Sequence, residues 1–261
     1  MYKRHSYVAA ALFLGALLGG CASGSPYQGL AADQLFELGA QKFEDGDWDE
    51  AVRAFERFIF AGPTNPRIVE ARLFLARAYF NREDYLTAVS EFSRIIDRHP
   101  GDRLAPDASL GICRSYVALS PHIERDQTYT LQAFNACDNV IQDFPSFGVA
   151  TEARQLRDQM REKLALKEYA RGDFYFQRKM YNSGIIYFNG VLTQYPVTEV
   201  AADALLRLYE SYTRIGWEAE AEDARERLLR EFPESAAAAQ VRASSGDGGG
   251  TERGTTQGRS P

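Results

Sequence analysis

The chain has 261 residues, with 30 basic and 36 acidic side chains that give a formal net charge of −6. An acidic balance argues against general nucleic-acid binding, because such binding depends on Lys and Arg side chains that neutralise phosphates. Its three cysteines are too few for a scaffold held together by disulfides.

The N-terminus has the pattern of a secretion signal. A short basic head precedes an apolar run, residues 7–18, which is shorter than the ~20 residues that a membrane span needs. The run ends in Leu-Gly-Gly-Cys at Cys21, which resembles the bacterial lipobox. By this resemblance residues 1–20 are a signal peptide, and Cys21 carries an N-acyl diacylglycerol lipid. Ala22 in the next position then indicates the outer membrane, so we expect a lipid anchor on its periplasmic face and no cofactor.

Two changes in composition bound the folded region. Residues 21–30 are mostly small and polar, which predicts a short flexible tether beside the lipid. Residues 244–261 contain no aliphatic or aromatic side chain and are predicted to be disordered. The region between them shows helical periodicity and no sustained strand-like alternation, so we expect an all-α fold.

Internal repetition is the strongest signal in this region. Pro63, Pro100, Pro145, Pro196 and Pro233 each follow an amphipathic segment with a similar tail, as in FERFIFAGP and FSRIIDRHP. Proline ends a helix because it lacks an N–H and restricts the residue before it. A two-helix unit that ends in Pro is typical of the tetratricopeptide repeat. The sequence therefore predicts a superhelix of five helix pairs.

Three features depart from a regular repeat. The third unit carries an insertion, residues 120–127, and the fourth begins with a long helix predicted over residues 151–179. A helix of that length favours a division into N-terminal repeats, residues 31–147, and C-terminal repeats, residues 148–243. A short Ala-rich helix over residues 235–242 is predicted to cap the stack.

No pattern of catalytic or metal-ligating residues is found, so we expect no enzyme activity and no metal site. The acidic segment of residues 44–50 is interpreted as a helix corner whose second helix is N-capped. Cys113 and Cys137 are expected to face inward on the helices of the third repeat. They either form a disulfide or act as small apolar fillers, and the second interpretation is favoured.

The first helix of each repeat is expected to line a concave, partly apolar groove. Mapped onto this chain, the groove positions are Phe36, Ala40 and Phe43, then Leu73, Arg77 and Phe80, then Leu110, Arg114 and Val117. The two arginines would suit the terminal carboxylate of a short aromatic peptide, since a guanidinium binds a carboxylate through two hydrogen bonds. Alternatively, these residues pack under the tether or a neighbouring helix, and both interpretations stay open.

Four stretches, together with the lipobox and the irregular repeats, resemble the BamD family of outer-membrane assembly lipoproteins. They are ERDQT at residues 124–128, KLALKEY at 163–169, FYFQR at 174–178 and YPVT at 195–198. The resemblance implies a periplasmic subunit of the β-barrel assembly machinery. Its partners would be a BamA-type barrel subunit, other assembly lipoproteins and the C-terminal segments of unfolded outer-membrane proteins.

One position departs from the family pattern and puts a partner contact in doubt. The family often has Arg before the Phe of the fourth repeat's second helix, where this chain has Tyr187 before Phe188. The competing interpretation of the whole chain is a periplasmic repeat adaptor that recruits cell-wall or division enzymes. The gaps of 45 residues between the second and third prolines and of 51 residues between the third and fourth count against that alternative.

Overall fold

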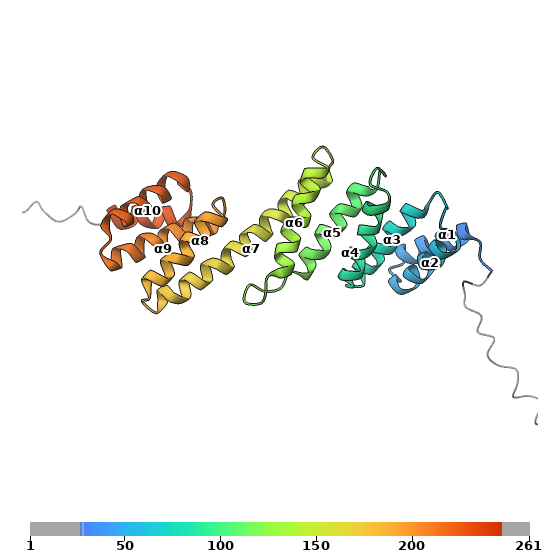
Figure 1. Cartoon of the computed structure of the whole chain (residues 1–261), viewed down its shortest axis with the longest axis horizontal. Coiled ribbons are helices and arrows are strands. Elements are labelled where there is room, and N and C mark those ends of the chain that lie inside the picture. The colour runs from blue at the N-terminus through green and yellow to red at the C-terminus, as the bar shows by residue number, and fades with distance from the viewer. Residues whose placement is uncertain (1–26, 28, 247–261) are drawn as a thin grey trace, which may run out of the picture.

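The chain forms an elongated row of antiparallel helices (Figure 1). The computed structural model describes Tyr27 and residues 29–246, and within these residues there are eleven helices and no strand. They pair as α1/α2, α3/α4, α5/α6, α7/α8 and α9/α10, with α11 at the end, which confirms the predicted tetratricopeptide superhelix. The helices are α1 (Ala32–Glu44), α2 (Trp48–Ala61), α3 (Ile68–Asn81), α4 (Tyr85–Arg98), α5 (Ala105–Leu119), α6 (Thr128–Asp143), α7 (Val149–Gln177), α8 (Tyr181–Gln194), α9 (Glu199–Ile215), α10 (Glu218–Glu231) and α11 (Ala236–Gly246).

Close approach between paired helices depends on glycine facing phenylalanine. Gly39 on α1 lies against the fully buried ring of Phe55 on α2, and Gly172 on α7 lies against that of Phe188 on α8. A Cβ atom at Gly172 would stand 2.6 Å from the Phe188 ring. The small residue lets the helices approach, and the large ring fills the space that they share. This arrangement matches the small and large positions that recur in the sequence.

Helix α7 joins the two halves of the stack. It has 29 residues and packs against α5 and α6 with its first part and against α8 and α9 with its last (Figure 1). It begins two residues before the predicted start and ends two before the predicted end, because Lys179 adopts a left-handed conformation (φ 60°) in the turn. The proposed division at residue 148 stays a prediction, since α7 contacts both parts.

The third repeat is closed by a disulfide. Cys113 on α5 and Cys137 on α6 are fully buried and bonded, with their Cα atoms 4.8 Å apart. The favoured interpretation of these cysteines as free apolar fillers is therefore wrong. Periodicity placed both side chains on inward faces, but only the packing of α5 on α6 brings their sulfur atoms together.

The insertion of residues 120–127 is held against α7 and does not extend freely. The Lys163 ammonium donates hydrogen bonds to the Ser120 hydroxyl, at 2.8 Å, and to its carbonyl, at 3.2 Å. Lys167 donates to the carbonyl of Arg125 at 3.3 Å. The side-chain amide of Gln127 donates to two carbonyls within the loop. These contacts fix the loop at one edge of the long helix.

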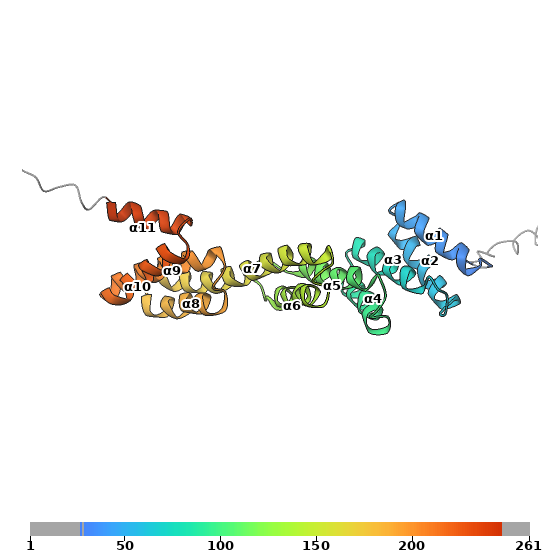
Figure 2. The ribbon, with the colours of Figure 1, turned by 90° about the horizontal axis from the view of Figure 1, so that it is seen from above.

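Both ends of the described chain differ from the expectations. Tyr27, within the predicted flexible tether, is only 9% exposed, because it packs on the core of the first repeat and donates a hydrogen bond to Glu50. At the other end, α11 continues to Gly246, past its predicted end and into the predicted disordered tail, since Val241 is buried against α9 and α10 (Figure 2). The signal peptide, Cys21 and residues 247–261 lie outside the described residues.

Candidate partner-binding surfaces

Three of the predicted groove residues do not line a groove. Phe36, Leu73 and Leu110 are between 1% and 5% exposed and belong to the core between neighbouring helices. The guanidinium of Arg67 lies over the Phe36 ring, 3.3 Å from its centroid. At these positions the structure therefore favours the alternative interpretation, packing against neighbouring helices. Helices α3 and α5 bury residues around much of their circumference, so sequence spacing could not separate the two faces of these helices at Leu73 and Leu110.

The aromatic groove residues are half-buried in small ring clusters. Phe43 contacts Trp48 and Phe74, with ring centroids 5.1 and 5.2 Å away. Phe80 contacts Tyr85 in the same edge-to-face manner at 5.2 Å. Their rings are therefore already in use by the repeat corners, and each leaves only part of one face to solvent. Ala40 and Val117 are likewise half-buried and packed against the cores of the first and third repeats.

A ladder of ion pairs connects the first helices of successive repeats. Its rungs are Arg67–Glu37 at 2.7 Å, Arg77–Asp107 at 3.4 Å, Arg114–Glu152 at 2.6 Å and Arg207–Asp173 at 3.2 Å. Each ion pair joins one repeat to the next, and two of the four engage predicted groove residues, Arg77 and Arg114. Exposed ion pairs contribute only about 0–1 kcal/mol each, so the ladder fixes orientation more than it stabilises the fold.

Two rungs hold the arginines that the sequence singled out, and they differ in strength. Arg114 donates from Nε and Nη2 to the two oxygens of Glu152, both at 2.6 Å, and these bonds hold the pKa of the Glu152 carboxyl below its ordinary value. Arg77 makes a single contact to Asp107 at 3.4 Å, with both side chains more than two-fifths exposed. Arg77 is therefore the arginine that can more readily accept a new carboxylate.

A second surface lies where the insertion, α7 and α8 meet. It is a pocket of about 390 Å³ lined by Ile123, Glu124, Lys167, Ala170, Arg171, Phe174, Tyr175 and Tyr187. Tyr187 stacks on Tyr175 with ring centroids 5.4 Å apart, and Phe174 is half exposed beneath the Arg178 guanidinium. The sequence marked Tyr187 as a departure from the family, and the structure shows that it forms one wall of this pocket.

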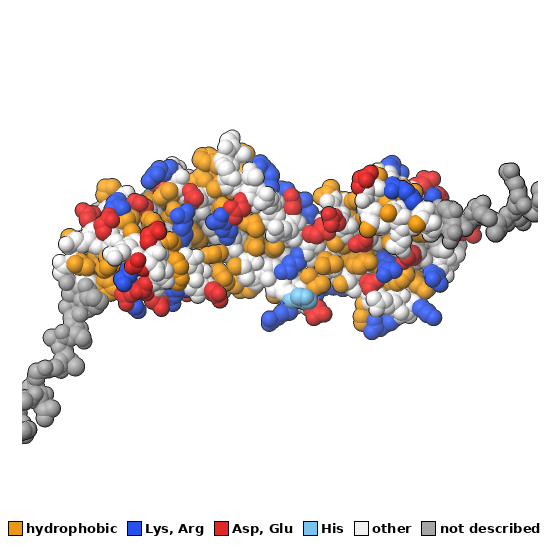
Figure 3. Space-filling view, turned by 180° about the vertical axis from the view of Figure 1, so that it is seen from behind, with side chains coloured by type: hydrophobic (Ala, Val, Ile, Leu, Met, Phe, Trp, Pro, Cys, Tyr) orange, Lys and Arg blue, Asp and Glu red, His pale blue; other side chains and the backbone are white. Residues whose placement is uncertain are grey.

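Exposed hydrophobic side chains lie near this pocket, on a surface that also carries charged side chains. The space-filling view shows hydrophobic side chains over the middle of the molecule, with Lys and Arg between them (Figure 3). Ile186, in the second turn of α8, is 71% exposed, and Met180, directly before that helix, is 48% exposed. Aromatic and apolar side chains with flanking arginines are the composition of protein-binding hot spots. Sequence reasoning missed the pocket because its walls come from three separate segments.

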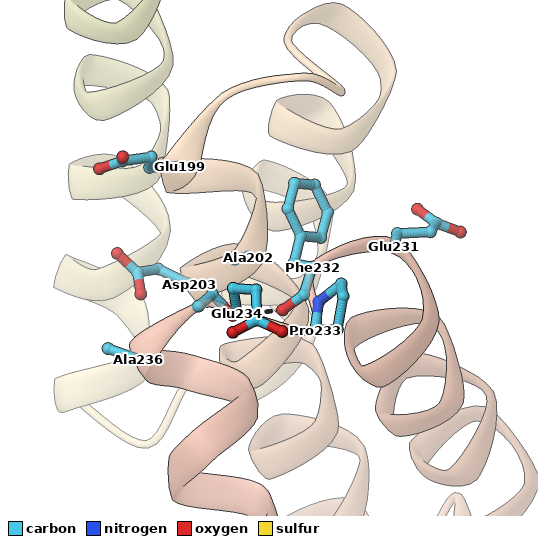
Figure 4. Close-up of a pocket in the computed structure, with 9 residues that line it drawn as sticks. Glu199, Ala202, Asp203, Glu231, Phe232, Pro233, Glu234 and Ala236 are labelled. Atoms are coloured by element: carbon cyan, nitrogen blue, oxygen red, sulfur yellow. Dashed lines mark hydrogen bonds between the residues drawn. The ribbon is translucent and has the colours of Figure 1, made fainter.

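A third concave surface has the opposite character. The pocket at the start of α11 has a volume of about 540 Å³ and is lined on two sides by the carboxylates of Glu199, Asp203, Glu231 and Glu234 (Figure 4). Among the described residues there is no group of three or more side chains placed to hold a metal ion. Of the carboxylates that line the pocket, that of Glu231 is already paired with Arg227 and Arg230, at 3.3 and 3.1 Å. None of the described helices is long and apolar enough to cross a bilayer.

Comparisons with known proteins show which family the chain is similar to. The family described as "YfiO: Outer membrane lipoprotein" matches residues 29–228. The chain is 29% identical over 223 residues to the outer membrane protein assembly factor BamD of Caulobacter vibrioides, covering 84% of this chain and 73% of that protein. It is 28% identical over 235 residues to the BamD of Rickettsia prowazekii, covering 89% and 94%.

The solved structures that align with the chain are more distant. The TPR2AB domain of yeast Sti1 aligns at a TM-score of 0.45 and 13% identity, covering 83% of this chain and 86% of that one. The helix pairs of the chain itself, rather than this alignment, establish its repeat architecture. Because the family match spans more than three-quarters of the sequence, the chain belongs to the YfiO/BamD family of outer membrane lipoproteins built from tetratricopeptide repeats.

Proposed function

We propose that this protein is a lipid-anchored, periplasmic subunit of the β-barrel assembly machinery at the outer membrane. It binds the barrel subunit of that machinery and the C-terminal segments of unfolded outer-membrane proteins, and it performs no catalysis. The names of its relatives support the assembly role. The lipobox at Cys21 supports the anchor, because two or more acyl chains hold a protein stably on a bilayer.

The observation that carries the proposal is the apolar pocket between the insertion, α7 and α8. A stable protein–protein interface needs a few aromatic anchors surrounded by polar side chains. Phe174, Tyr175 and Tyr187 supply the anchors, while Lys167 and Arg171 supply the rim. We assign this pocket to the barrel subunit, with Tyr187 making an apolar contact in place of a charged one.

Affinity purification of the anchored protein from its own envelope, followed by mass spectrometry, tests this assignment. We expect the wild-type chain to recover a large β-barrel protein with periplasmic domains. Tyr187→Ala should lose it, because truncating an interface anchor costs about 2 kcal/mol or more. Trp217→Ala is the matched control, since Trp217 is an exposed aromatic residue at another corner of the stack. Recovery of cell-wall or division enzymes without the barrel protein would instead identify a recruiting adaptor.

For the peptide-binding role, we assign the carboxylate contact to Arg77 rather than to Arg114. An incoming terminal carboxylate would replace Asp107, which holds Arg77 by one long and exposed contact. Replacing Glu152 on Arg114 would instead break two hydrogen bonds of 2.6 Å. The exposed part of Phe80 lies one helical turn further along α3, where an aromatic side chain of the peptide would stack.

Peptides that end in an aromatic residue, with a free or an amidated C-terminus, test this contact in a fluorescence-polarisation titration. The free acid should bind about tenfold more tightly or better, because a hydrogen bond to a charged group contributes about 1.5–3 kcal/mol. Arg77→Gln should remove the difference between the two peptides, whereas Arg114→Gln should keep it. Equal affinity of both peptides for the wild-type chain would refute the carboxylate contact.

A further inference from the structure

Tyr27, the described residue nearest to the proposed lipid anchor, is docked on the first repeat. Tyr27 packs against the core of α1 and α2, and its hydroxyl donates to the Glu50 carboxylate, which also pairs with Arg53. Tyr27 is six residues after Cys21, and a fully extended chain of that length spans at most about 21 Å. The covalent lipid therefore limits how far the outer side of α2 can lie from the bilayer.

The face of α2 beside Tyr27 has an unusual combination of side chains. Arg53, Glu56, Arg57 and Phe60 follow one another at helical spacing and line a groove of about 430 Å³ with Tyr27. Phe60 is 84% exposed, more than any other large hydrophobic side chain in the described part of the chain. An aromatic side chain so exposed costs free energy in water unless another apolar phase covers it.

The charged side chains on this face differ in how far their hydrogen-bonding groups are already engaged. The Glu50 carboxylate is occupied by Tyr27 and Arg53, and Glu56 accepts a hydrogen bond of 2.7 Å from the Tyr79 hydroxyl. Arg57 makes no ion pair or hydrogen bond with any residue that the structure describes. Within the described part of the chain, the groove therefore presents one guanidinium without a partner, next to the Glu56 carboxylate and beside one exposed aromatic ring. This pair is complementary to the phosphates and the acyl boundary of a lipid surface.

We propose that this outer face of α2 is a membrane-contact surface, with Phe60 at the boundary between headgroups and acyl chains and Arg57 on a lipid phosphate. The inference rests on the lipid anchor of the proposed function. An acyl anchor plus an apolar contact and one phosphate-binding guanidinium is a stronger attachment than the anchor alone, and the contact also fixes the orientation of the protein. The first repeat would lie on the membrane, and the rest of the stack would extend from it.

Site-specific quenching by brominated lipids tests the contact on the acylated mature chain. Phe60→Cys and Ile186→Cys variants, each labelled with an environment-sensitive dye, are reconstituted in vesicles of phosphatidylethanolamine and phosphatidylglycerol with brominated acyl chains. Ile186 is the matched control, because it is apolar, 71% exposed and far along the stack. We expect the dye at position 60 to shift to the blue and to lose severalfold more intensity than the dye at position 186.

A second pair of variants tests the guanidinium. Arg57→Gln in the Phe60→Cys background should lose most of the quenching, whereas Arg154→Gln, at an exposed position on α7, should not. Vesicle flotation distinguishes a failure of the lipid anchor from a failure of the membrane-contact surface. A chain that floats with an unquenched dye at position 60, or with equal quenching at positions 60 and 186, would overturn the membrane-contact surface alone. A chain that does not float would refute the lipid anchor and the contact together.

Discussion

The packing of Gly172 against Phe188 gives a sharp test of how the fourth repeat is held together. In a Gly172→Ala variant the new Cβ would lie 2.6 Å from one ring carbon of Phe188 and 2.8 Å from another. Ordinary van der Waals contacts between carbon atoms lie near 3.5–4.0 Å. Phe188 is fully buried, so its ring has no free space into which it can move. Either the side-chain rotamer of Phe188 or the distance between α7 and α8 must change.

Overpacking of this kind costs about 1–3 kcal/mol. Replacing a helical Gly by Ala also stabilises the helix by about 1 kcal/mol, which offsets part of the cost of the clash. The stability of Gly172→Ala must therefore be compared with that of another Gly→Ala variant that has no clash. Gly190→Ala on α8 serves as this control, because the nearest atom to that Cβ would be an oxygen of the Glu168 side chain at 3.3 Å, which can move. The free energies of unfolding of the two variants should therefore differ by the cost of the clash, about 1–3 kcal/mol.

Urea denaturation followed by far-ultraviolet circular dichroism measures both variants under the same conditions. The double variant Gly172→Ala with Phe188→Ala provides the internal check. Phe188→Ala alone should cost about 3–5 kcal/mol, and in its presence Gly172→Ala should no longer destabilise, because the opposing ring is absent. The reasoning would be refuted if Gly172→Ala were as stable as Gly190→Ala, or if its effect persisted without the ring.

Three further predictions concern contacts between helices. Glu162 on α7 accepts backbone hydrogen bonds of 3.2 and 2.9 Å from the first turn of α9. Glu162→Ala should therefore lower the free energy of unfolding by about 0.5–2 kcal/mol. Glu162→Gln keeps an acceptor oxygen and should lose less stability in the same denaturation assay. Reducing the bond between Cys113 and Cys137 should cost about 3 kcal/mol, measured as a lower midpoint in reductant, because the bond closes a loop of 24 residues. The hydrogen bonds from Arg114 lower the pKa of Glu152. The ion pair therefore adds to the free energy of unfolding above pH 4.5, the ordinary pKa of the carboxyl, and this stabilisation is lost as the pH falls through the lowered pKa. Glu152→Gln should therefore be less stable than wild type at neutral pH but equally stable in strong acid, and a constant difference across pH would contradict this.

The sequence by itself determined the repeat architecture. The five prolines mark the ends of α2, α4, α6, α8 and α10, because a residue without an N–H stops a helix at any position beyond its first turn. The insertion at residues 120–127 and the long helix α7 were also predicted, within two residues at the ends of α7. These features follow from local backbone chemistry and from the period of apolar residues. Local backbone chemistry and apolar periodicity do not depend on contacts with residues distant in the sequence.

Only the tertiary structure decided which faces of the helices are free. Phe36 and Leu73 lie in the core rather than in a groove, because neighbouring repeats cover positions that spacing alone assigns to the surface. The Arg114–Glu152 rung and the pocket at Tyr187 each join segments far apart in the chain. The disulfide likewise needed α5 and α6 in register. A sequence fixes the period of each helix, but the angle at which helices pack determines which side chains meet.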